Sequence, residues 1–310
     1  MTQTKIHFLG TGCMSPTKER HHLSVALEHN GNIFLFDCGE ATQNRIKEMK
    51  LPHGKIKKIF ISHWHGDHTL GLLGLVQTLS NVDTIENIEI HGPIDSKKYF
   101  NHMLQSTIFE TETKIEVIEH SPKEGELLKI LDGAGYEISC AKLNHSVPCI
   151  GYTFKQKDTY NIDLEKLKKI EPKLENNILL ARTKMGLPIE FEGRTIKADE
   201  ITYKKEGLKV SFVFDTRPCQ GAKILAENAD YLVMESTFSF KKHSNKAEEY
   251  DHMSAKETAE IASESGVKNL LITHFSQRYK DITEIEEEAR EYFENTQATE
   301  DLMTIKLKKE

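Results

Sequence analysis

The sequence predicts a mixed α/β fold, and two observations carry this prediction. Apolar runs with the length of buried strands alternate along the 310 residues with segments whose apolar side chains recur at helical spacing. Several of these runs stop at a short polar turn that contains histidine or aspartate. Because a strand that feeds a helix leaves its turn at the carboxyl end of a sheet, we expect these turns to gather where open α/β folds place their sites.

Composition indicates a soluble globular protein and argues against several other classes. Hydrophobic residues make up 38% of the chain and charged residues 29%. No apolar run approaches the length of a membrane span, and the polar N-terminus lacks a signal-peptide core, so the sequence predicts a cytoplasmic protein without a membrane partner. The formal charge of −7 argues against a general nucleic-acid coat. The five scattered cysteines fit reduced thiols better than a disulfide framework.

The first half of the chain reads mostly as strands. A first strand spans residues 5–9, and two alternating runs on either side of Asn30-Gly31 predict a β-hairpin, since this dipeptide favours a tight hairpin turn. A helix is expected around residues 97–108. Further strands are expected at residues 59–61, 88–90, 115–118, 136–143 and 150–154.

The second half repeats the theme of strands that end in polar residues. Apolar runs at residues 210–214, 231–234 and 269–272 end at Asp215, at Glu235 and just before His274. Ser254 and Glu257 are spaced as a capping box, which predicts the start of the next helix.

Residues 155–207 differ in composition and apolar pattern from the segments on either side. The stretch contains a short amphipathic helix and a small hairpin around Glu192-Gly193, and its many lysines and arginines are nearly balanced by acids. It reads either as a solvated face or as a binding arm. We therefore predict one domain over residues 1–310, with 155–207 as an insertion on it.

The densest group of functional side chains follows the apolar run at residues 59–61. His63, His65, Asp67 and His68 lie within six positions, directly before a segment with helical spacing. Imidazoles with a carboxylate suit zinc or manganese, and two neighbouring groups suit two ions about 3.5–4 Å apart. The pattern His-x-His-x-Asp-His resembles the metal signature of the metallo-β-lactamase superfamily. That resemblance implies an αββα sandwich with a dinuclear metal site at its edge.

Three more residues at strand ends complete a set of seven predicted ligands. His63, His65 and His145 would hold one ion, and Asp67, His68 and His274 the other. Asp215 would bridge the two, because a carboxylate can offer one oxygen to each ion. Asp67 is also the candidate to accept a proton from the attacking water.

Five motifs are spread along nearly the whole chain, at residues 36–43, 62–68, 214–218, 235–238 and 273–279. Together they resemble the ribonuclease Z family of tRNA 3′-processing endonucleases, in its short form. This resemblance implies a homodimer that cleaves a phosphodiester near the 3′ end of precursor tRNA and leaves a 3′-hydroxyl on the tRNA, with zinc as the usual metal.

The resemblance also implies roles for residues outside the ligand set. His252 matches the family's catalytic histidine beside the scissile phosphate, and Glu235 matches the carboxylate that orients it. Arg217 and Arg278 follow ligand positions closely. Either they face substrate phosphates or they form structural ion pairs near the site.

In one respect the chain departs from the family pattern. Residues 155–207 occupy the place of the family's protruding arm but lack its Gly- and Pro-rich tip. Two alternatives to tRNA processing therefore stay open: hydrolysis of small phosphodiesters or related esters on the same fold, and a non-catalytic RNA-binding protein. The complete ligand set argues against the second of these, since a binding module does not need a metal cage.

Overall fold

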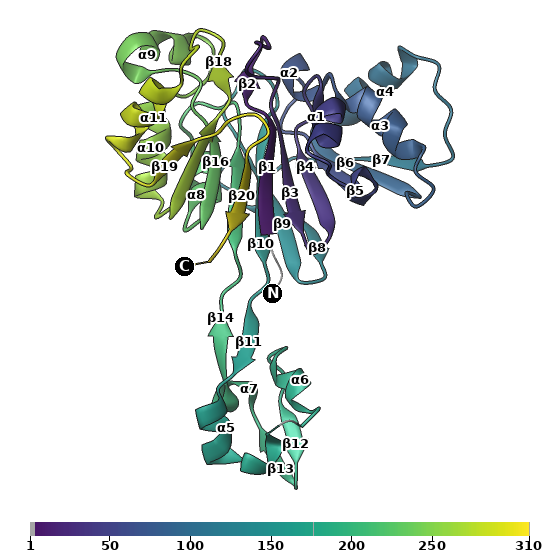
Figure 1. Cartoon of the computed structure of the whole chain (residues 1–310), viewed down its shortest axis with the longest axis vertical. Coiled ribbons are helices and arrows are strands. Elements are labelled where there is room, and N and C mark those ends of the chain that lie inside the picture. Colours follow the sequence, from purple (N-terminus) through teal and green to yellow (C-terminus); the bar gives the residue numbers. More distant parts are fainter. Residues whose placement is uncertain (1–3, 176, 310) are drawn as a thin grey trace. The chain divides into compact units, whose positions relative to one another are not determined.

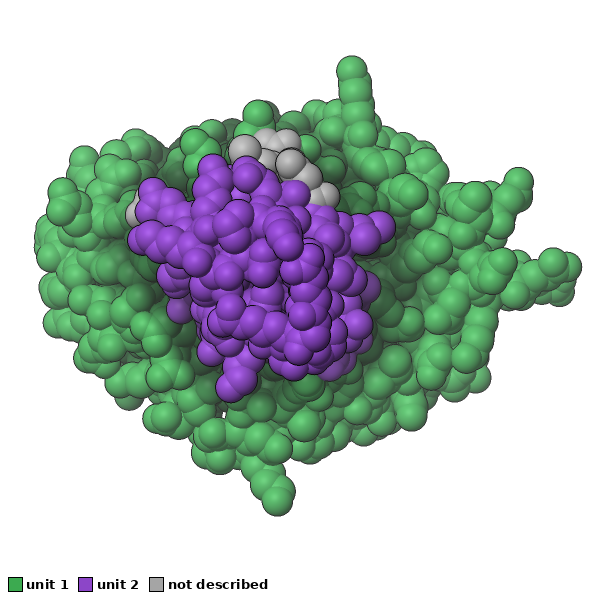
Figure 2. All heavy atoms as spheres, turned by 90° about the horizontal axis from the view of Figure 1, so that it is seen from below, with its two compact units in different colours: residues 1–131, 138–154, 209–310 green, residues 132–137, 155–208 purple. Residues whose placement is uncertain are grey.

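The computed structural model describes residues 4–175 and 177–309, which form two compact units. The first unit comprises residues 1–131, 138–154 and 209–310, and the second comprises residues 132–137 and 155–208 (Figures 1 and 2). The predicted insertion at 155–207 thus falls almost entirely within the second unit. Its description as an insertion on a single domain stays a prediction.

The first unit is built on two seven-stranded sheets. In the first sheet the order is β20-β1-β3-β4-β5-β6-β7, antiparallel from β20 to β4 and parallel from β4 to β7. Its strands are β1 (Thr4–Gly10), β3 (Ser24–His29), β4 (Asn32–Phe36), β5 (Ile56–Phe60), β6 (Asn87–Pro93), β7 (Lys114–His120) and β20 (Thr304–Leu307).

The second sheet has the order β19-β17-β16-β15-β10-β9-β8, with β15, β16, β17 and β19 parallel. Its strands are β8 (Leu128–Gly133), β9 (Tyr136–Lys142), β10 (Ile150–Gln156), β15 (Lys209–Val213), β16 (Tyr231–Glu235), β17 (Asn269–Thr273) and β19 (Thr296–Ala298). A separate two-stranded ladder joins β2 (Gly12–Cys13) to β18 (Phe275–Ser276).

Aromatic side chains join the facing surfaces of the two sheets. The rings of Phe36 on β4 and Phe212 on β15 stack with centroids 3.8 Å apart, and Tyr152 on β10 contacts Phe36 and Phe60. Alternate residues of the same strands, such as Ile33 and Leu35, point the other way into a core beneath helices. Both faces of each sheet are therefore covered, which is why these strands read as continuous apolar runs.

Helices cover the outer face of each sheet. On the first sheet Leu72, Leu75 and Phe100 pack from α3 and α4, and on the second Leu225 and Ile285 pack from α8 and α11. The layers are thus helix, sheet, sheet, helix, as predicted. The helices of this unit are α1 (Thr42–Glu48), η1 (His53–Lys55), α2 (Gly66–Thr69), α3 (Leu72–Ser80), α4 (Ser96–Gln105), α8 (Gln220–Ala226), α9 (Phe240–Glu249), α10 (Ala255–Glu264) and α11 (Thr283–Arg290).

Local signals in the sequence correspond to local structure. Asn30 and Gly31 both have positive φ, 51° and 74°, as the tight hairpin turn between β3 and β4 requires. Ser254 and Glu257 form the predicted capping box at the start of α10. None of the described helices is long and apolar enough to cross a membrane.

The second unit has its own small core, to which Leu167, Leu174 and Ile189 contribute. The predicted amphipathic segment has four apolar residues, Leu164, Leu167, Ile170 and Leu174. Leu167 and Leu174 are buried in this core, Ile170 is partly buried against it, and Leu164 is exposed. Glu192 and Gly193 turn the predicted hairpin with φ of 47° and 79°. The elements are β11 (Thr159–Ile162), α5 (Leu164–Ile170), η2 (Pro172–Leu174), α6 (Leu180–Thr183), β12 (Ile189–Phe191), β13 (Arg194–Ile196), α7 (Ala198–Ile201) and β14 (Thr202–Lys205).

Candidate metal centre

The seven predicted ligands lie together in the first unit, in loops that follow strands of both sheets. The loop after β5 supplies His63 and His65, the short helix α2 that follows it supplies Asp67 and His68, and the segments after β9, β15 and β17 supply one ligand each. They are His63, His65, Asp67, His68, His145, Asp215 and His274.

One group of donor atoms gathers around His65. Its Nδ1 lies 3.0 Å from Nε2 of His63 and 3.3 Å from Nε2 of His145. An oxygen of Asp215 lies 3.6 Å from Nε2 of His63. Ligand atoms on a tetrahedral zinc ion, with bonds of about 2.0–2.1 Å, are about 3.3 Å apart, so this group can surround one ion.

The second group gathers around His68 and also contains Asp215. Nε2 of His68 lies 3.3 Å from Asp215 Oδ2 and 3.5 Å from Asp67 Oδ2. Nε2 of His274 lies 3.5 Å from the same Asp67 oxygen. Asp215 is thus the one carboxylate shared by the two groups, as the bridging assignment requires.

Orphaned polar atoms provide a test of whether metal ions fit here. Nε2 of His68, Nε2 of His274 and Oδ1 of Asp215 are buried and have no hydrogen-bond partner among the described residues. Leaving a buried polar group unpaired costs about 1–3 kcal/mol, and three such groups converge on one place. Their donor types are those that divalent transition-metal ions prefer, so the residues fit the two ions.

Hydrogen bonds fix the orientation of the histidine rings. Asp37 accepts from Nδ1 of His68 at 2.7 Å and from the Ser62 backbone and hydroxyl, both at 2.7 Å. The Ser62 hydroxyl in turn accepts from Nδ1 of His63 at 3.0 Å. His145 donates from Nδ1 to the Asp251 carbonyl at 3.1 Å. These bonds leave the Nε2 lone pairs of the three rings free for an ion, the arrangement that outer partners of metal sites usually enforce.

The electrostatics of the cluster follow from buried charges of both signs. Burial alone would raise the pKa of Asp215, but the surrounding histidines, His274 and His68 first, hold it well below its usual value. Burial would lower the pKa of His68, yet Asp215, Asp67 and Asp37 raise it well above normal. A metal ion bound at Nε2 of His68 would neutralise the same carboxylate charges that otherwise favour a proton on this ring.

A further histidine and carboxylate lie beside the metal cluster. Nδ1 of His252 lies 3.1 Å from Glu235 Oε2 and 3.9 Å from Asp215 Oδ2. Glu235 is fully buried, and its oxygens also accept from the Thr216 backbone and the Thr237 hydroxyl, both at 2.6 Å. Its carboxylate is therefore held firmly in position against His252.

Comparison with known proteins shows similarity to ribonuclease Z over nearly the whole chain. Ribonuclease Z of Protochlamydia amoebophila is 35% identical over 306 residues, covering 98% of this chain and 97% of that protein. The chain belongs to the ribonuclease Z family. The crystal structure of human tRNase Z, short form, superimposes with a TM-score of 0.71 at 25% identity, covering 97% of this chain and 98% of that one.

Two other matches concern the fold and the first half of the chain. YhfI of Bacillus subtilis, a metallo-β-lactamase fold protein, has a TM-score of 0.69 at 18% identity over 99% of this chain and 100% of that one, which shows the shared fold alone. A family model described as "Anti-Pycsar protein Apyc1" matches residues 4–181. That match ends before Asp215, Glu235, His252 and His274, whereas the ribonuclease Z match includes them.

The two arginines with predicted substrate contacts differ in their surroundings. The guanidinium of Arg217 makes a two-pronged ion pair with Glu257, at 2.6 and 3.2 Å, and donates to the His252 carbonyl at 2.5 Å. These contacts favour the structural reading for Arg217. Arg278 lines the cavity over the metal cluster and lies 5.8 Å from the Phe238 ring. Phosphate contact by either arginine stays a prediction.

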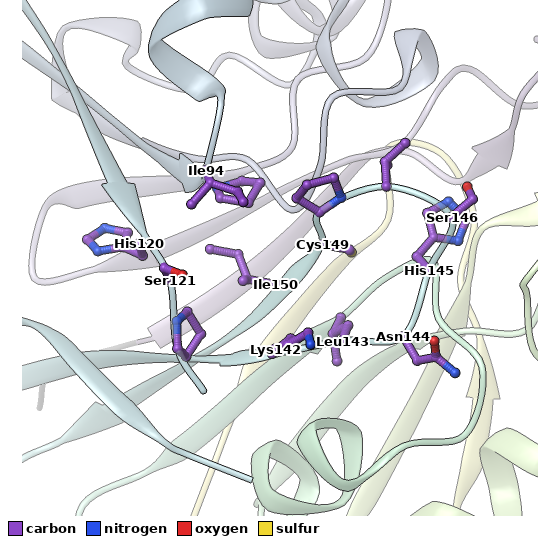
Figure 3. Close-up of a pocket in the computed structure, with 14 residues that line it drawn as sticks. Ile94, His120, Ser121, Lys142, Leu143, Asn144, His145, Ser146, Cys149 and Ile150 are labelled. Carbon is purple, nitrogen blue, oxygen red and sulfur yellow. The ribbon is translucent and has the colours of Figure 1, made fainter. Parts of the chain in front are cut away.

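Two cavities of the first unit meet at the ribonuclease Z centre. The larger, about 640 Å³, is lined by Asp67, His252, Tyr250 and Arg278. The smaller, about 380 Å³, extends from His145 and Ser146 past Asn144 and Lys142 to His120 (Figure 3). His145 and Ser146 line both cavities, so the two cavities adjoin at the loop that carries His145.

Sequence reasoning gave no role to Asp37 or Ser62, and it left Thr237 unassigned. Thr237 accepts from Nδ1 of His274 at 3.0 Å and donates to Glu235, so it links a ligand to the carboxylate behind His252. All three lie within motifs that carry the family resemblance. Their positions were the available signal: Ser62 directly precedes the ligand His63, Asp37 directly follows β4, and Thr237 lies two residues after Glu235.

Proposed function

We propose that this protein is a metal-dependent endoribonuclease that hydrolyses a phosphodiester near the 3′ end of precursor tRNA and leaves a 3′-hydroxyl on the tRNA. The observation that carries the proposal is the cluster of seven ligand-type side chains beside the His252–Glu235 pair, in a chain that matches ribonuclease Z over 98% of its length.

Each side chain has a distinct part in holding the ions. His63, His65 and His145 would hold one ion, Asp67, His68 and His274 would hold the other, and Asp215 would contribute to both groups. When bound, the two ions would acidify a water and neutralise charge on the phosphoryl group. Asp67, whose Oδ2 also accepts from the Met14 backbone at 2.8 Å, would accept the proton of the attacking water.

His252 supplies the proton for the leaving group. Burial alone would lower the pKa of His252, but Glu235 and then Asp215 raise it to about 9, and the Glu235 carboxylate in particular favours the protonated ring. Glu235 holds Nδ1, which leaves the Nε2–H edge for the 3′-oxygen of the departing tRNA body. Glu235 thus acts as a positioning residue for His252.

Finer assignments complete the proposal. Zinc is the proposed ion, because imidazole and carboxylate donors at about 3.3 Å from one another suit its small tetrahedral site, and manganese is the alternative. The family resemblance supports a homodimer, and the pattern of free cysteines supports a cytoplasmic location.

Hydrolysis of small phosphodiesters is the second candidate function. It is favoured by the second unit, where lysines are paired with acids and no Gly- and Pro-rich tip is present in the sequence. Lys173 contacts Glu192 at 3.0 Å and Lys204 contacts Asp158 at 2.8 Å. Exposed pairs of this kind contribute only about 0–1 kcal/mol, so phosphates can replace the acids, and the pairing does not exclude an RNA-binding arm.

One assay separates the two candidates. Precursor tRNA with a 3′ trailer is incubated with the purified protein beside bis-p-nitrophenyl phosphate. A single cut at the trailer junction supports tRNA processing. Turnover of the small ester with no cut in the RNA would favour the second candidate.

A further inference from the structure

Cys13 lies directly beside the second group of metal ligands, although neither the sequence motifs nor the proposed mechanism uses it. It ends the short strand β2, which pairs in parallel with β18, so that Cys13 is opposite Ser276 and Gly12 is opposite Phe275. The backbone N–H of Phe275 donates to the Thr11 carbonyl at 2.9 Å. This ladder holds Cys13 against the segment that begins with His274.

The thiol faces the same point as two ligand atoms. Sγ of Cys13, a carboxylate oxygen of Asp67 and a ring nitrogen of His274 lie within 4.8 Å of one another. The next residue, Met14, donates its backbone N–H to Asp67 Oδ2 at 2.8 Å, which ties the cysteine's loop to the same carboxylate. Cys13 is 8% exposed and lines the cavity of about 640 Å³, so a proton lost from sulfur can reach solvent.

An independent feature indicates that an ion belongs at this point. Nε2 of His274 is fully buried, is directed at the space between Asp67 and His68, and has no hydrogen-bond partner among the described residues. A thiol alone would be an ordinary buried cysteine. A thiol, a carboxylate and an unpaired imidazole nitrogen around one space are the donor types of a zinc site.

The other cysteines near the centre are already engaged. Cys149 donates to the carbonyl oxygens of Phe214 and Asp215, at 3.7 and 3.5 Å. Cys219 accepts from the Ala222 backbone at 3.4 Å and caps α8. Of the candidate metal groups formed by described residues, only the one with Asp67 and His274 includes a cysteine.

We propose that Cys13 is a thiolate ligand of the ion held by Asp67, His68 and His274. The inference rests on the proposed dinuclear centre and deepens it. On binding, the S–H bond breaks, a sulfur–metal bond of about 2.3 Å forms, and the proton leaves to solvent. Because thiolate is a soft donor, it favours zinc over manganese at this position, while the all-imidazole and carboxylate position lacks that preference.

X-ray absorption at the zinc edge of the wild-type holoenzyme tests the proposal without any variant. The expected result is two equivalents of zinc with one sulfur neighbour at about 2.3 Å per two ions, which is about half a sulfur per zinc in the averaged signal. Cobalt-loaded protein should show a thiolate-to-cobalt charge-transfer band in the near ultraviolet. Two equivalents of zinc with nitrogen and oxygen neighbours only would overturn the role of Cys13 and leave the proposed function standing. Failure to bind any ion would overturn both.

Substitution assigns the sulfur to one residue. Cys13→Ser should lose the sulfur neighbour and the cobalt band, and its preference for zinc over manganese should fall about tenfold or more, since even outer partners of metal sites contribute about 10–100-fold. The matched control is Cys219→Ser, which keeps a polar cap on α8 and should retain both signals. Retention of the sulfur neighbour in Cys13→Ser would contradict the assignment.

Discussion

The carboxylate of Asp37 accepts a hydrogen bond from Nδ1 of His68 at 2.7 Å, and both side chains are fully buried. This contact joins the end of β4 to the short helix α2, across 31 positions of the chain. It keeps the His68 ring turned so that Nε2 faces Asp67 and Asp215. The metal cluster thus depends on a residue that does not itself belong to either ligand group.

Asp37→Asn should weaken metal binding at the second position by about 10–100-fold, because the amide is a poorer acceptor from His68 and from Ser62. The measurement is retention of zinc during titration with a chelator. Asp95→Asn is the matched control, since both aspartates have positive φ, 55° and 70°, which asparagine tolerates. Equal zinc retention by the two variants would show that Asp37 does not support the site.

His252→Ala should lower kcat on precursor tRNA by roughly 10²–10⁴-fold, the usual contribution of a general acid. The variant should keep two equivalents of metal, because His252 is proposed to act as an acid and not as a ligand. Metal analysis beside kinetics checks both parts. Loss of one ion from His252→Ala would mean that the histidine is a ligand.

The pH profile follows from the same residue. A general acid must be protonated, so the rate should fall as pH rises through the pKa of His252, which Glu235 and Asp215 raise to about 9 when unopposed. Metal ions bound at Asp215 would reduce the contribution of this residue to the raised pKa of His252. The alkaline limb of the pH profile should therefore lie below pH 9. Glu235→Gln removes the largest raising charge and should shift the limb to lower pH. An unmoved limb would indicate that another group carries the proton.

The site was more predictable from sequence than the contacts that support it. His63, His145, Asp215 and His274 each follow an apolar run, and the carboxyl ends of strands converge, so position alone brought them together. The support given by Asp37 to His68 is a pairing across the chain that no local pattern encodes. Arg217 could not be assigned either, because its ion pair depends on where Glu257 on α10 comes to lie.

The fold was predictable where a strand or turn carries its own signal. The hairpin at Asn30-Gly31 carries such a signal in its turn dipeptide, and the buried parallel strands carry one in their apolar runs. The strands β8, β19 and β20 went unassigned, because β19 and β20 have only three and four residues and β8 has no buried residue that would mark it as an apolar run. β20, for example, pairs Leu307 with Thr4, at the far end of the chain. Such long-range pairing is decided by tertiary packing and not by local propensity.

His91 and His120, in the first sheet, should make folding sensitive to acid. Nδ1 of His91 lies 3.0 Å from Nε2 of His120 and the rings stack (Figure 3 shows His120). Burial lowers the pKa of both, and that of His120, next to His91, falls to about 4. Below the unfolded value of about 6.5 the unfolded chain binds more protons, so stability should fall between pH 6.5 and 4.

His120→Gln should reduce this acid sensitivity, by about 1–2 kcal/mol between pH 7 and pH 4.5 after allowance for the partial exposure of the ring. Urea denaturation at both pH values, with metal removed, gives the difference. His102→Gln, on the exposed face of α4, is the control, and its stability should depend on pH as that of the parent does. The same slope in both variants would refute the role of the pair.

The second unit can be shortened at a point that the strand register defines. Ile162 on β11 pairs with Thr202 on β14, so replacing residues 163–201 by Asn-Gly should close the hairpin. If this unit grips tRNA phosphates, the variant should bind precursor tRNA more weakly, and each lost contact should flatten the salt dependence by roughly 0.7–0.9 in the slope.

Hydrolysis of bis-p-nitrophenyl phosphate by the shortened variant is the internal control, because all seven proposed ligands belong to the first unit and the deletion removes only residues of the second. It should be unchanged. Equal loss on tRNA and on the small ester, or dissociation of an oligomer, would show that the unit contributes to packing and is not a dedicated RNA arm.

Removal and return of the metal tests the central claim most directly. Wild-type protein is assayed on precursor tRNA with a 3′ trailer, stripped by a chelator, and then titrated with zinc while the ends of the product are mapped. We predict loss of cleavage on stripping, recovery that saturates at two equivalents, no recovery in His65→Ala, and a 3′-hydroxyl on the tRNA body. Full cleavage by the metal-free protein would contradict the account.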